Sequence, residues 1–593
     1  MTAHRAANGH NGHPTERSPL LGQRRTSDGL QVLAPQPVGD GPEDDYEGDN
    51  GGGFEDDGGD LERQESNISE AGTTLNKYKG LPEVKKRMKY ILPAVAVGIF
   101  LSAADQTIIV SSYGRIGSDL GALNNTSWIA TAYFLTLTSF QPLYGKLSDI
   151  FGRKSCLLFA YTIFGIGCLA CGLARNMNEL IAARAFAGVG GGGMTTVVSI
   201  MMSDIVTLRE RGKWQGYINI VFATGAGTGA PLGGILADRV GWRWVFLFQP
   251  PLCVVAIIAV SLALKLPKRD HSHWKEKLRR IDFLGAVILI AAVFMLLLGL
   301  DRGSNVSWRD RTTLASLGAS VPLFLLFLLV ETKVASDPFA PGHIIFERSL
   351  VACYACNFFS FGGYMAALFY LPLYFQVVDG ASATQAGVRL IPGIIAGVTG
   401  SLFGGFYMQW TGRFYRLTVA AYAGLVVGAA VIFVCAGGGA RLLPPQFAPV
   451  NSTLGIVLGL CVSGFSNGIG VTTSLIGLIS NAAHADQAVA TACSYLFRSL
   501  GSVFGVSLAA TLVNQELRAR LAAALGSGAE AAAIAERVRQ SIESIWELPP
   551  AVAEVVRRCY AESTRSAFGL MIALVAGAAV SAWFVRERRL GGK

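Results

Sequence analysis

Segments of about twenty apolar residues recur along this chain from residue 90 onward. Each is long enough to cross the ~30 Å hydrocarbon layer of a membrane. The chain is 51% hydrophobic and 15% charged, whereas soluble domains contain about a quarter charged residues, so most of the apolar surplus must face lipid. We predict an all-α membrane protein with fourteen transmembrane helices. Their expected ranges are 91–111, 127–147, 156–174, 180–204, 214–237, 244–265, 281–300, 312–331, 350–377, 385–408, 417–437, 453–480, 489–513 and 565–585.

The distribution of positive charge predicts how these helices are oriented. Basic residues gather in alternate loops, for example at 85–89, at Arg153 and Lys154, and at 586–589. The positive-inside rule assigns such loops to the cytosol, and with them both chain termini, as an even number of spans also requires. The alternation accounts for the net charge of +9 without a nucleic-acid partner.

The N-x-Ser/Thr sequons at Asn124, Asn305 and Asn451 fit the predicted topology. All three fall in loops assigned to the non-cytosolic side. Short sequons also occur by chance, and several of these lie close to the membrane, so their glycosylation stays open.

Residues 1–80 are rich in Gly, Pro, Ser and acidic residues and have almost no apolar periodicity. This composition predicts a disordered cytosolic tail. Within it, Glu16, Leu20 and Leu21 form an ExxxLL pattern that resembles the acidic dileucine signal, which adaptor complexes read when they sort cargo to vacuoles or lysosomes. A disordered tail also produces such a short pattern by chance, so an adaptor partner is one of two interpretations.

An internal repeat divides the apolar part of the chain. The stretch from Gly145 to Arg153 has a degraded copy from Gly405 to Arg413, and in both stretches two glycines seven residues apart precede an arginine. Repeated halves are typical of secondary transporters, which build a central site between them. We predict an N-terminal six-helix half at 91–265, two inserted helices at 281–331, a C-terminal six-helix half at 350–585, and a cytosolic C-terminus at 586–593.

The segment 514–564 is predicted to be a long loop on the non-cytosolic side. Its residues 515–545 are rich in Ala, Glu and Arg, and we expect them to form an amphipathic helix that lies on the membrane surface.

Asp105 lies inside the first apolar segment, where an aspartate costs roughly 2.5–3.5 kcal/mol on insertion scales. A charge kept there is a functional hypothesis by default and needs a partner. We expect the partner to be Arg184 of the fourth segment, because the two residues lie at a similar depth below the non-cytosolic surface. Protonation of Asp105 would then release Arg184. A buried pair that only fixes the packing is the alternative.

Two further motifs flank or interrupt apolar segments. The sequence GKLSDIFGRK, from Gly145 to Lys154, lies between the second and third segments. The sequence GAGTGAPLGG lies inside the fifth segment, where proline and glycine let a helix bend and let neighbouring helices pack closely. Its candidate hinge residues are Gly225, Gly229, Pro231 and Gly234.

These motifs together resemble the major facilitator superfamily. GKLSDIFGRK matches the loop-two signature GxLxDxxGRK of that superfamily, and GAGTGAPLGG is similar to its antiporter signature. Fourteen spans and the Asp105-Gln-Thr107 element resemble the drug:proton antiporter branch, although this chain has Ala104 where that branch often has leucine. The stretches 125–133 and 241–246 look like those of the fungal vacuolar basic amino acid transporters.

The resemblance implies a major facilitator fold, with two six-helix halves plus two extra central helices. It also implies that Asp105, Thr107 and Arg184 couple protons to substrate. In the loop signature, Gly145 permits close helix approach and Asp149 accepts hydrogen bonds from a neighbouring helix N-terminus. Together with Gly152, Arg153 and Lys154, these residues would hold a cytosolic gate closed. A charge cluster that only sets the topology is the alternative.

Polar residues of the second half could complete a cavity or could bond a neighbouring helix, and the sequence does not separate the two. The candidates are Asn357, Tyr364, Gln376, Asn467 and Arg498, of which Arg498 is a loose counterpart of Arg184.

The predicted function is a proton-coupled antiporter that moves basic amino acids into the vacuole. A plasma-membrane exporter of drugs or toxic metabolites, and a nutrient receptor that binds without transport, are the alternatives. We expect no enzyme, no cofactor and no metal. The Gly-rich stretch 188–193 has no preceding strand and no Walker lysine, and the CxxC pairs at 168–171 and 353–356 lack a His or acidic partner.

Overall fold

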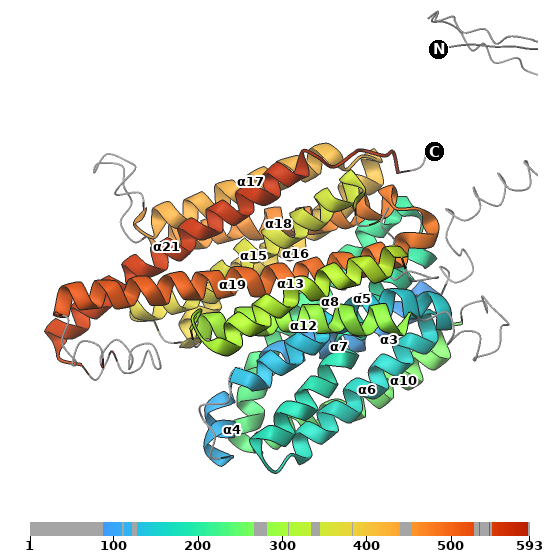
Figure 1. The fold of residues 1–593 in the computed structure, drawn as a ribbon. Coiled ribbons are helices and arrows are strands. Elements are labelled where there is room, and N and C mark those ends of the chain that lie inside the picture. Colours follow the sequence, from blue (N-terminus) through green and yellow to red (C-terminus); the bar gives the residue numbers. More distant parts are fainter. Residues whose placement is uncertain are drawn as a thin grey trace, which may run out of the picture. The chain divides into compact units, whose positions relative to one another are not determined.

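The computed structural model describes residues 87–109, 112–120, 127–265, 282–305, 307–333, 344, 346–381, 383–438, 452–526, 533, 545 and 548–590. The regular elements within these ranges are all helices (Figure 1). They are α3 (Met88–Ile108), α4 (Tyr113–Asp119), α5 (Ser127–Phe151), α6 (Arg153–Leu173), α7 (Met177–Ile205), α8 (Leu208–Arg239), α9 (Arg243–Leu247), α10 (Gln249–Ala263), α12 (Phe283–Asn305), α13 (Arg311–Lys333), α15 (Arg348–Val377), α16 (Ala383–Thr411), α17 (Tyr415–Cys435), α18 (Thr453–Asn481), the 3₁₀ turn η3 (His484–Asp486), α19 (Gln487–Leu525) and α21 (Pro550–Ala582).

The all-helical membrane fold is confirmed, but the count of fourteen spans is not. In the described part of the chain, 13 helices are long and apolar enough to cross a membrane. The predicted span 127–147 corresponds to α5, which has 25 residues but is too polar to count among them. Thr138, Ser139 and Gln141 of α5 are buried, because the helix packs between α7 and α19. A helix surrounded by protein does not need the apolar surface that lipid demands.

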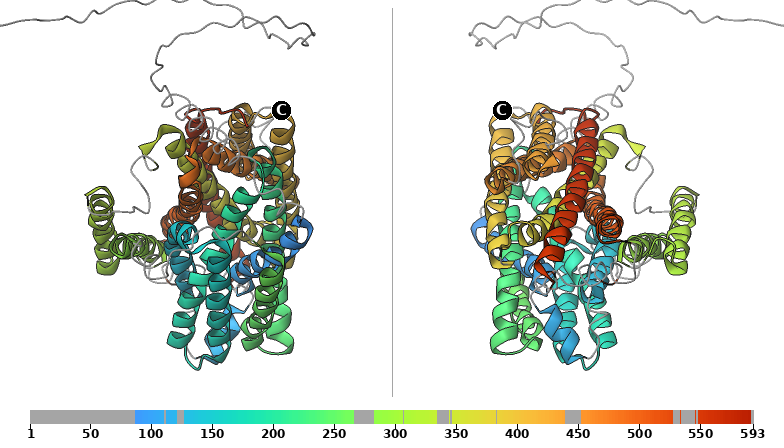
Figure 2. Two further views of the ribbon diagram at one scale, coloured as in Figure 1. Left: turned by 90° about the vertical axis from the view of Figure 1, so that its right-hand side faces the viewer. Right: turned by 90° about the vertical axis from the view of Figure 1, so that its left-hand side faces the viewer.

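The helices form two groups by their contacts. In the first group, α3 packs on α8, α5 and α6 pack on α7, and α10 packs on α6. In the second group, α16 and α17 pack on α18, and α15 packs on α19 and α21. The hairpin of α12 and α13 lies beside both, and α12 contacts α5 as well as α19 (Figure 2). On α13, Val321, Leu325 and Leu329 are exposed, as expected of a surface that faces lipid.

The segment 514–564 is less of a loop than predicted. Helix α19 continues to Leu525, and α21 already begins at Pro550. Leu517 and Leu521 of α19 pack against Val556 and Tyr560 of α21, so the two helices extend together. Arg520 also pairs with glutamates of both helices (Glu516 and Glu562). Most of residues 527–547 lie outside the described residues, so the predicted surface helix stays a prediction there.

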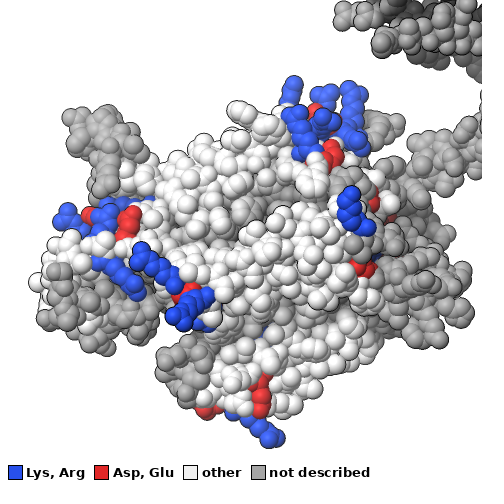
Figure 3. All heavy atoms as spheres, in the orientation of Figure 1, with Lys and Arg blue, Asp and Glu red and all other residues white. Residues whose placement is uncertain are grey.

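Charged side chains mark the ends of the helices. On the face drawn in Figure 3, the described Lys, Arg, Asp and Glu residues gather in groups near helix ends, and the surface between the groups is uncharged. An uncharged band between charged ends is what a membrane-embedded bundle requires.

The two copies of the sequence repeat share a backbone feature. Gly152 joins α5 to α6 with φ +88, and Gly412 follows α16 with φ +68. L-residues with side chains rarely adopt such angles, which explains why glycine stands at this point of both repeats. We call the end of the bundle at Gly152 the signature end.

We predict that Gly412→Ala lowers the apparent melting temperature of the purified protein by several degrees. No atom lies within 4 Å of the added methyl group, so the loss comes from the left-handed backbone alone, about 1–2 kcal/mol. Gly318→Ala, in α13, is the matched control: it also meets no atom within 4 Å, but its backbone is helical and alanine favours a helix. Equal melting temperatures for the two variants would contradict the prediction.

Candidate transport site

A buried ion pair joins α3 to α7. Nη1 of Arg184 lies 2.7 Å from Oδ2 of Asp105, and both side chains are 0% exposed. Asp105 is three residues before the end of α3, and Arg184 is seven residues after the start of α7. The two residues thus lie near the end of the bundle opposite the signature end. The structure brings together the pair that the sequence suggested.

Side chains from three more helices complete the surroundings of the pair. Gln249 of α10 donates from Nε2 to Oδ1 of Asp105 at 3.1 Å. Nε of Arg184 donates to the Ile129 carbonyl of α5 at 3.1 Å, and the guanidinium carbon lies 4.3 Å from the centre of the Tyr133 ring. Cys168 of α6 lies against Gln249, with 3.7 Å between Sγ and Oε1. The carboxylate is held by hydrogen bonds and the cation by an aromatic face.

An apolar layer separates the pair from the nearest membrane surface. Ile108, Ile129, Val245 and Phe246 belong to one buried cluster, and the Phe246 ring lies 5.7 Å from the Arg184 guanidinium carbon. Because Asp105 has no exposed surface, a proton can reach its carboxylate only after these helices move.

Thr107 connects the helix of Asp105 to α8. Its hydroxyl donates to the Ala226 carbonyl of α8 at 2.9 Å. Gly225 and Gly229 place the α8 backbone against α3, where an added methyl group would collide with the Phe100 and Ala104 carbonyls. Close helix contact therefore requires the glycines.

Pro231 lies inside α8, which is a single helix from Leu208 to Arg239. Since proline has no N–H, the carbonyl four residues earlier, at Gly227, lacks its helical partner, and this turn of α8 is the weakest point of the helix. Gly234 lies in the next turn and is half-buried.

The signature residues form a second charged cluster. Arg153 pairs with Asp149 at 2.7 Å and with Asp204 of α7 at 2.8 Å, and it also donates to the Ser148 hydroxyl at 2.5 Å. Lys154 donates to the Ser261 carbonyl of α10 at 2.7 Å. The cluster thus joins the ends of α5, α7 and α10 within the first group.

Contacts between the two groups lie toward the signature end. Gly145 of α5 packs on α19, where an added methyl group would lie 2.8 Å from Cβ of Ala492. Arg209 donates to the Gln409 carbonyl of α16 at 2.5 Å, and Arg211 donates to Gln487 of α19 at 3.2 Å.

One face of α8 contacts α16. Gly216 and Asn219 lie on the face of α8 that contacts α16, and Asn219 donates to the Ser401 hydroxyl at 2.8 Å. The same face continues through Gly227, where an added methyl group would meet no atom within 4 Å. Among the described residues, the contacts between the groups named above therefore lie toward the signature end, and the face of α8 that contacts α16 has free space at Gly227.

The predicted cavity residues of the second group differ in their surroundings. Asn357 is buried and donates to the Ser494 hydroxyl at 3.1 Å. Tyr364 belongs to the apolar cluster of the second group, and Gln376 donates to the Pro372 carbonyl of its own helix, so their cavity role stays a prediction. Asn467 and Arg498 each keep a buried polar atom without a hydrogen-bond partner.

Some predicted positions cannot be placed. Glu16, Leu20 and Leu21 lie outside the described residues, as do Asn124 and Asn451. The dileucine signal and these sequons stay predictions.

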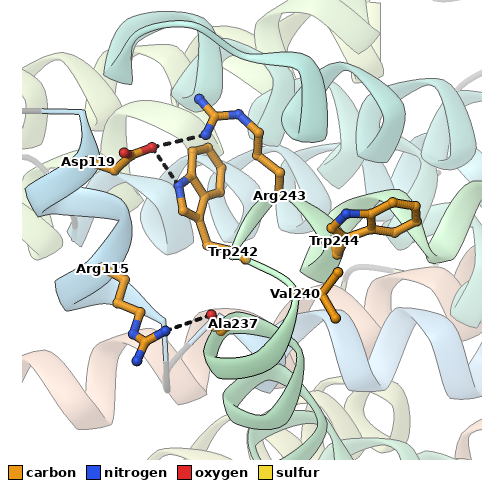
Figure 4. Close-up of a pocket in the computed structure, with 8 residues that line it drawn as sticks. Arg115, Asp119, Ala237, Val240, Trp242, Arg243 and Trp244 are labelled. Atoms are coloured by element: carbon orange, nitrogen blue, oxygen red, sulfur yellow. Dashed lines mark hydrogen bonds and ion pairs between the residues drawn. The ribbon is translucent and has the colours of Figure 1, made fainter.

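A groove of about 740 Å³ opens beside the end of α8 (Figure 4). Arg115 of α4 donates to the Ala237 carbonyl at 2.7 Å, and Asp119 of α4 accepts from the Trp242 indole at 2.9 Å and from Arg243 at 3.0 Å. These bonds lower the pKa of Asp119 below its ordinary value of 3.8, the indole bond contributing most. The hydrogen bonds along this groove hold α4 against the end of α8 and the start of α9.

Comparisons with known proteins agree with this architecture. Residues 95–506 match the sequence profile of the Major Facilitator Superfamily. The chain is 38% identical to a vacuolar membrane amino acid uptake transporter of Schizosaccharomyces pombe over an alignment of 501 residues. This alignment covers 84% of each of the two chains. It is 39% identical over 487 residues to a multidrug resistance protein of the same yeast (82% of this chain, 90% of the relative). A vacuolar basic amino acid transporter of Saccharomyces cerevisiae is 38% identical over 400 residues (65% and 81%).

The fold has solved counterparts. The solved structure of the proton:xylose symporter XylE superposes on this chain with a TM-score of 0.55 and 14% sequence identity. The superposition covers 85% of this chain and 97% of the XylE chain. The chain therefore belongs to the Major Facilitator Superfamily, and it is an integral membrane transporter. The resemblance inferred from the motifs is confirmed.

The sequence analysis missed two residues at the charged clusters. Gln249 lies just before a Pro-Pro pair inside an apolar run, and Asp204 ends the fourth predicted span. Polar residues in such positions are a recognisable signal. The sequence gives no indication, however, of which helix they face.

We predict that the Asp119 tether persists in mildly acidic solution. A lowered pKa means that the contribution of Asp119 to stability is complete above pH 3.8 and is lost only as the pH falls through the lowered value. The melting temperatures of wild type and Asp119→Asn should therefore differ by a constant amount from about pH 7 to pH 5 and converge only below pH 3.8, as the pH falls through the lowered pKa. A difference that vanishes between pH 6 and pH 5 would contradict this.

Proposed function

We propose that this protein is a proton-coupled antiporter that moves basic amino acids into the vacuole. The observation that carries the proposal is the completely buried pair of Asp105 and Arg184. A pair of this kind contributes little net stability against an apolar replacement, so a role beyond packing explains why the charges are kept.

Protonation of Asp105 is the coupling step of the proposal. The neutral acid no longer holds Arg184 by charge, although Gln249 and the Ile129 carbonyl keep both side chains bonded. Losing one charge of a buried pair costs about 3–5 kcal/mol, which is enough to shift a balanced conformational equilibrium almost completely.

The shift is passed from α3 to α8. Thr107 lies two residues after Asp105 and bonds α8 at Ala226, one turn before the weak point at Pro231. In the proposal, α8 responds by moving against α16. The signature end would be the cytosolic side, and the described conformation would be the one closed to the cytosol.

The substrate and the compartment are supported by the relatives. One relative bears the name of a vacuolar membrane amino acid uptake transporter and another that of a vacuolar basic amino acid transporter. Asp105 suits a cationic substrate or the proton itself. An acidic dileucine signal at Glu16, Leu20 and Leu21 supports delivery to the vacuole through an adaptor complex, with both termini in the cytosol.

A plasma-membrane exporter of drugs is the second candidate, favoured by the multidrug resistance relative at 39% identity. Replacing Leu20 and Leu21 by alanine separates the two. A vacuolar protein that depends on the signal moves to the plasma membrane, whereas an exporter that resides there keeps its location.

We predict that vacuolar vesicles containing the protein take up labelled arginine when energised with ATP. A protonophore should abolish this uptake, and Asp105→Asn should reduce it at least about tenfold, because the amide cannot take up and release the coupling proton. The measurement is uptake above that of vesicles from cells without the protein. Asp310→Asn, which removes a carboxylate between α12 and α13, is the control and should retain uptake within about twofold.

Arginine uptake by Asp105→Asn equal to that of wild type would refute Asp105 as the coupling residue. Vesicles that contain the wild-type protein yet take up no basic amino acid would refute the substrate assignment and favour drug export. Saturable arginine binding without any flux would identify a receptor.

We predict that Arg153→Gln opens the cytosolic gate. With the native cysteines replaced, Ser499→Cys is the reporter, since Ser499 bonds Gln141 where the two groups meet. Loss of about 1.4 kcal/mol of closed-state preference would raise its reaction with an impermeant thiol reagent from the cytosolic side about tenfold. Arg175→Gln, exposed at the opposite end, should leave the rate unchanged. An unchanged rate in Arg153→Gln would mean that the cluster only sets topology.

A further inference from the structure

Arg498 is a positive charge deep within the second group. It lies eleven residues after Gln487, the first residue of α19, which is about 16 Å along the helix from the signature end. A cation at this depth is costly and needs compensation.

Three other arginines in the spanning helices have their positive charge compensated by aspartates. Arg184 has Asp105, Arg153 has Asp149 and Asp204, and Arg389 has Asp379 at 2.6 Å. Arg498 has no described carboxylate within 4.0 Å, and its buried Nε atom has no hydrogen-bond partner.

Two aromatic rings hold the Arg498 side chain. Its guanidinium carbon lies 4.5 Å from the centre of the Phe361 ring of α15 and 5.0 Å from that of Tyr495. Ring faces attract the cation and fix its position, and the Tyr495 side chain also hydrogen-bonds with the guanidinium. The guanidinium is thus held in place while its Nε–H has no hydrogen-bond partner.

Arg498 lies where the two helix groups meet. The next residue, Ser499, donates to Gln141 of α5 in the first group at 3.1 Å. Gly501 packs on the Phe358 carbonyl of α15. Successive residues of a helix are turned by about 100°, so Arg498 lies between the side of α19 that faces α5 and the side that faces α15.

The polar residues one turn away are already paired with one another. The Ser494 hydroxyl accepts from Nδ2 of Asn357 at 3.1 Å, and Oδ1 of Asn357 accepts from the Ser474 hydroxyl at 3.4 Å. Next to this paired cluster, Arg498 has no described carboxylate within 4.0 Å, and its Nε atom has no hydrogen-bond partner.

We propose that Arg498 binds the carboxylate of the transported amino acid, an inference that rests on the proposed function. A guanidinium presents paired N–H donors that match the two oxygens of a carboxylate. The substrate then supplies the negative charge that the protein lacks at this point. An amine drug without a carboxylate cannot do so, and this gives the site a preference for amino acids.

The test compares arginine with agmatine, which is arginine without its carboxylate. The full-length wild type, in proteoliposomes with an imposed pH gradient, takes up labelled arginine in competition with either unlabelled compound. Agmatine should need at least about a tenfold higher concentration for half-inhibition, because it forms no charged hydrogen bond with the guanidinium. In Arg498→Gln, the concentration of arginine needed for half-inhibition should rise about tenfold, whereas that of agmatine should stay unchanged. The ratio of the agmatine concentration to the arginine concentration therefore approaches one.

Two variants serve as controls. Arg498→Lys keeps the charge but not the paired donors, and its ratio should be intermediate. Arg389→Gln removes another arginine of the second group and should keep the wild-type ratio, since Arg389 is engaged by Asp379.

The outcomes separate this inference from the function on which it rests. Equal competition by arginine and agmatine in the wild type, a measurement that needs no variant, overturns the role of Arg498 alone. A ratio of half-inhibiting concentrations in Arg498→Gln equal to that of wild type also overturns the role of Arg498. A wild-type protein that takes up no arginine overturns the proposed function, and the inference with it.

Discussion

A charge inside a membrane must be compensated by the protein, and this constraint organises the whole molecule. Asp105 and Arg184 satisfy it together, at 2.7 Å and without exposed surface. Doing so requires five helices to converge, because Gln249, the Ile129 carbonyl and Cys168 come from α10, α5 and α6. In the proposed mechanism, changing the protonation of this one carboxylate therefore affects the packing of an entire helix group. In a soluble protein, water would compensate the lost charge and the effect would stay local.

The conformation fits a carrier caught on one side of its cycle. Contacts between the groups, such as those of Gly145 with Ala492 and of Arg209 with Gln409, lie toward the signature end. Toward the other end, the face of α8 that contacts α16 has free space at Gly227. The buried pair, the proposed hinge at Pro231 and the signature end are linked through α3 and α8. Arg498 lies where the groups meet, so the proposed proton and carboxylate sites occupy different groups and could be loaded in turn.

Sequence analysis predicted the family, the helical membrane fold and the partner of Asp105. These predictions succeeded because lipid imposes long apolar runs and because an intramembrane aspartate leaves few candidates for its counter-charge. The predicted count of fourteen spans is not confirmed, because α5 matches the predicted span 127–147 but is less apolar than the 13 counted helices. The burial of α5 between α7 and α19 depends on helices far away in sequence. Sequence analysis also did not predict the extended α19 and α21. Their Ala- and Glu-rich residues favour a helix anywhere, and only packing such as that of Leu517 on Val556 decides where it lies.

The measurement that tests the central claim most directly compares two modes of arginine transport by Asp105→Asn in proteoliposomes. One mode is exchange of labelled for unlabelled arginine without a pH gradient, and the other is accumulation driven by such a gradient. A residue that couples protons is needed only for the second mode. The account predicts that exchange persists within about threefold of wild type while gradient-driven accumulation is lost. Accumulation that persists at the wild-type level, or loss of both modes in a folded protein, would contradict it.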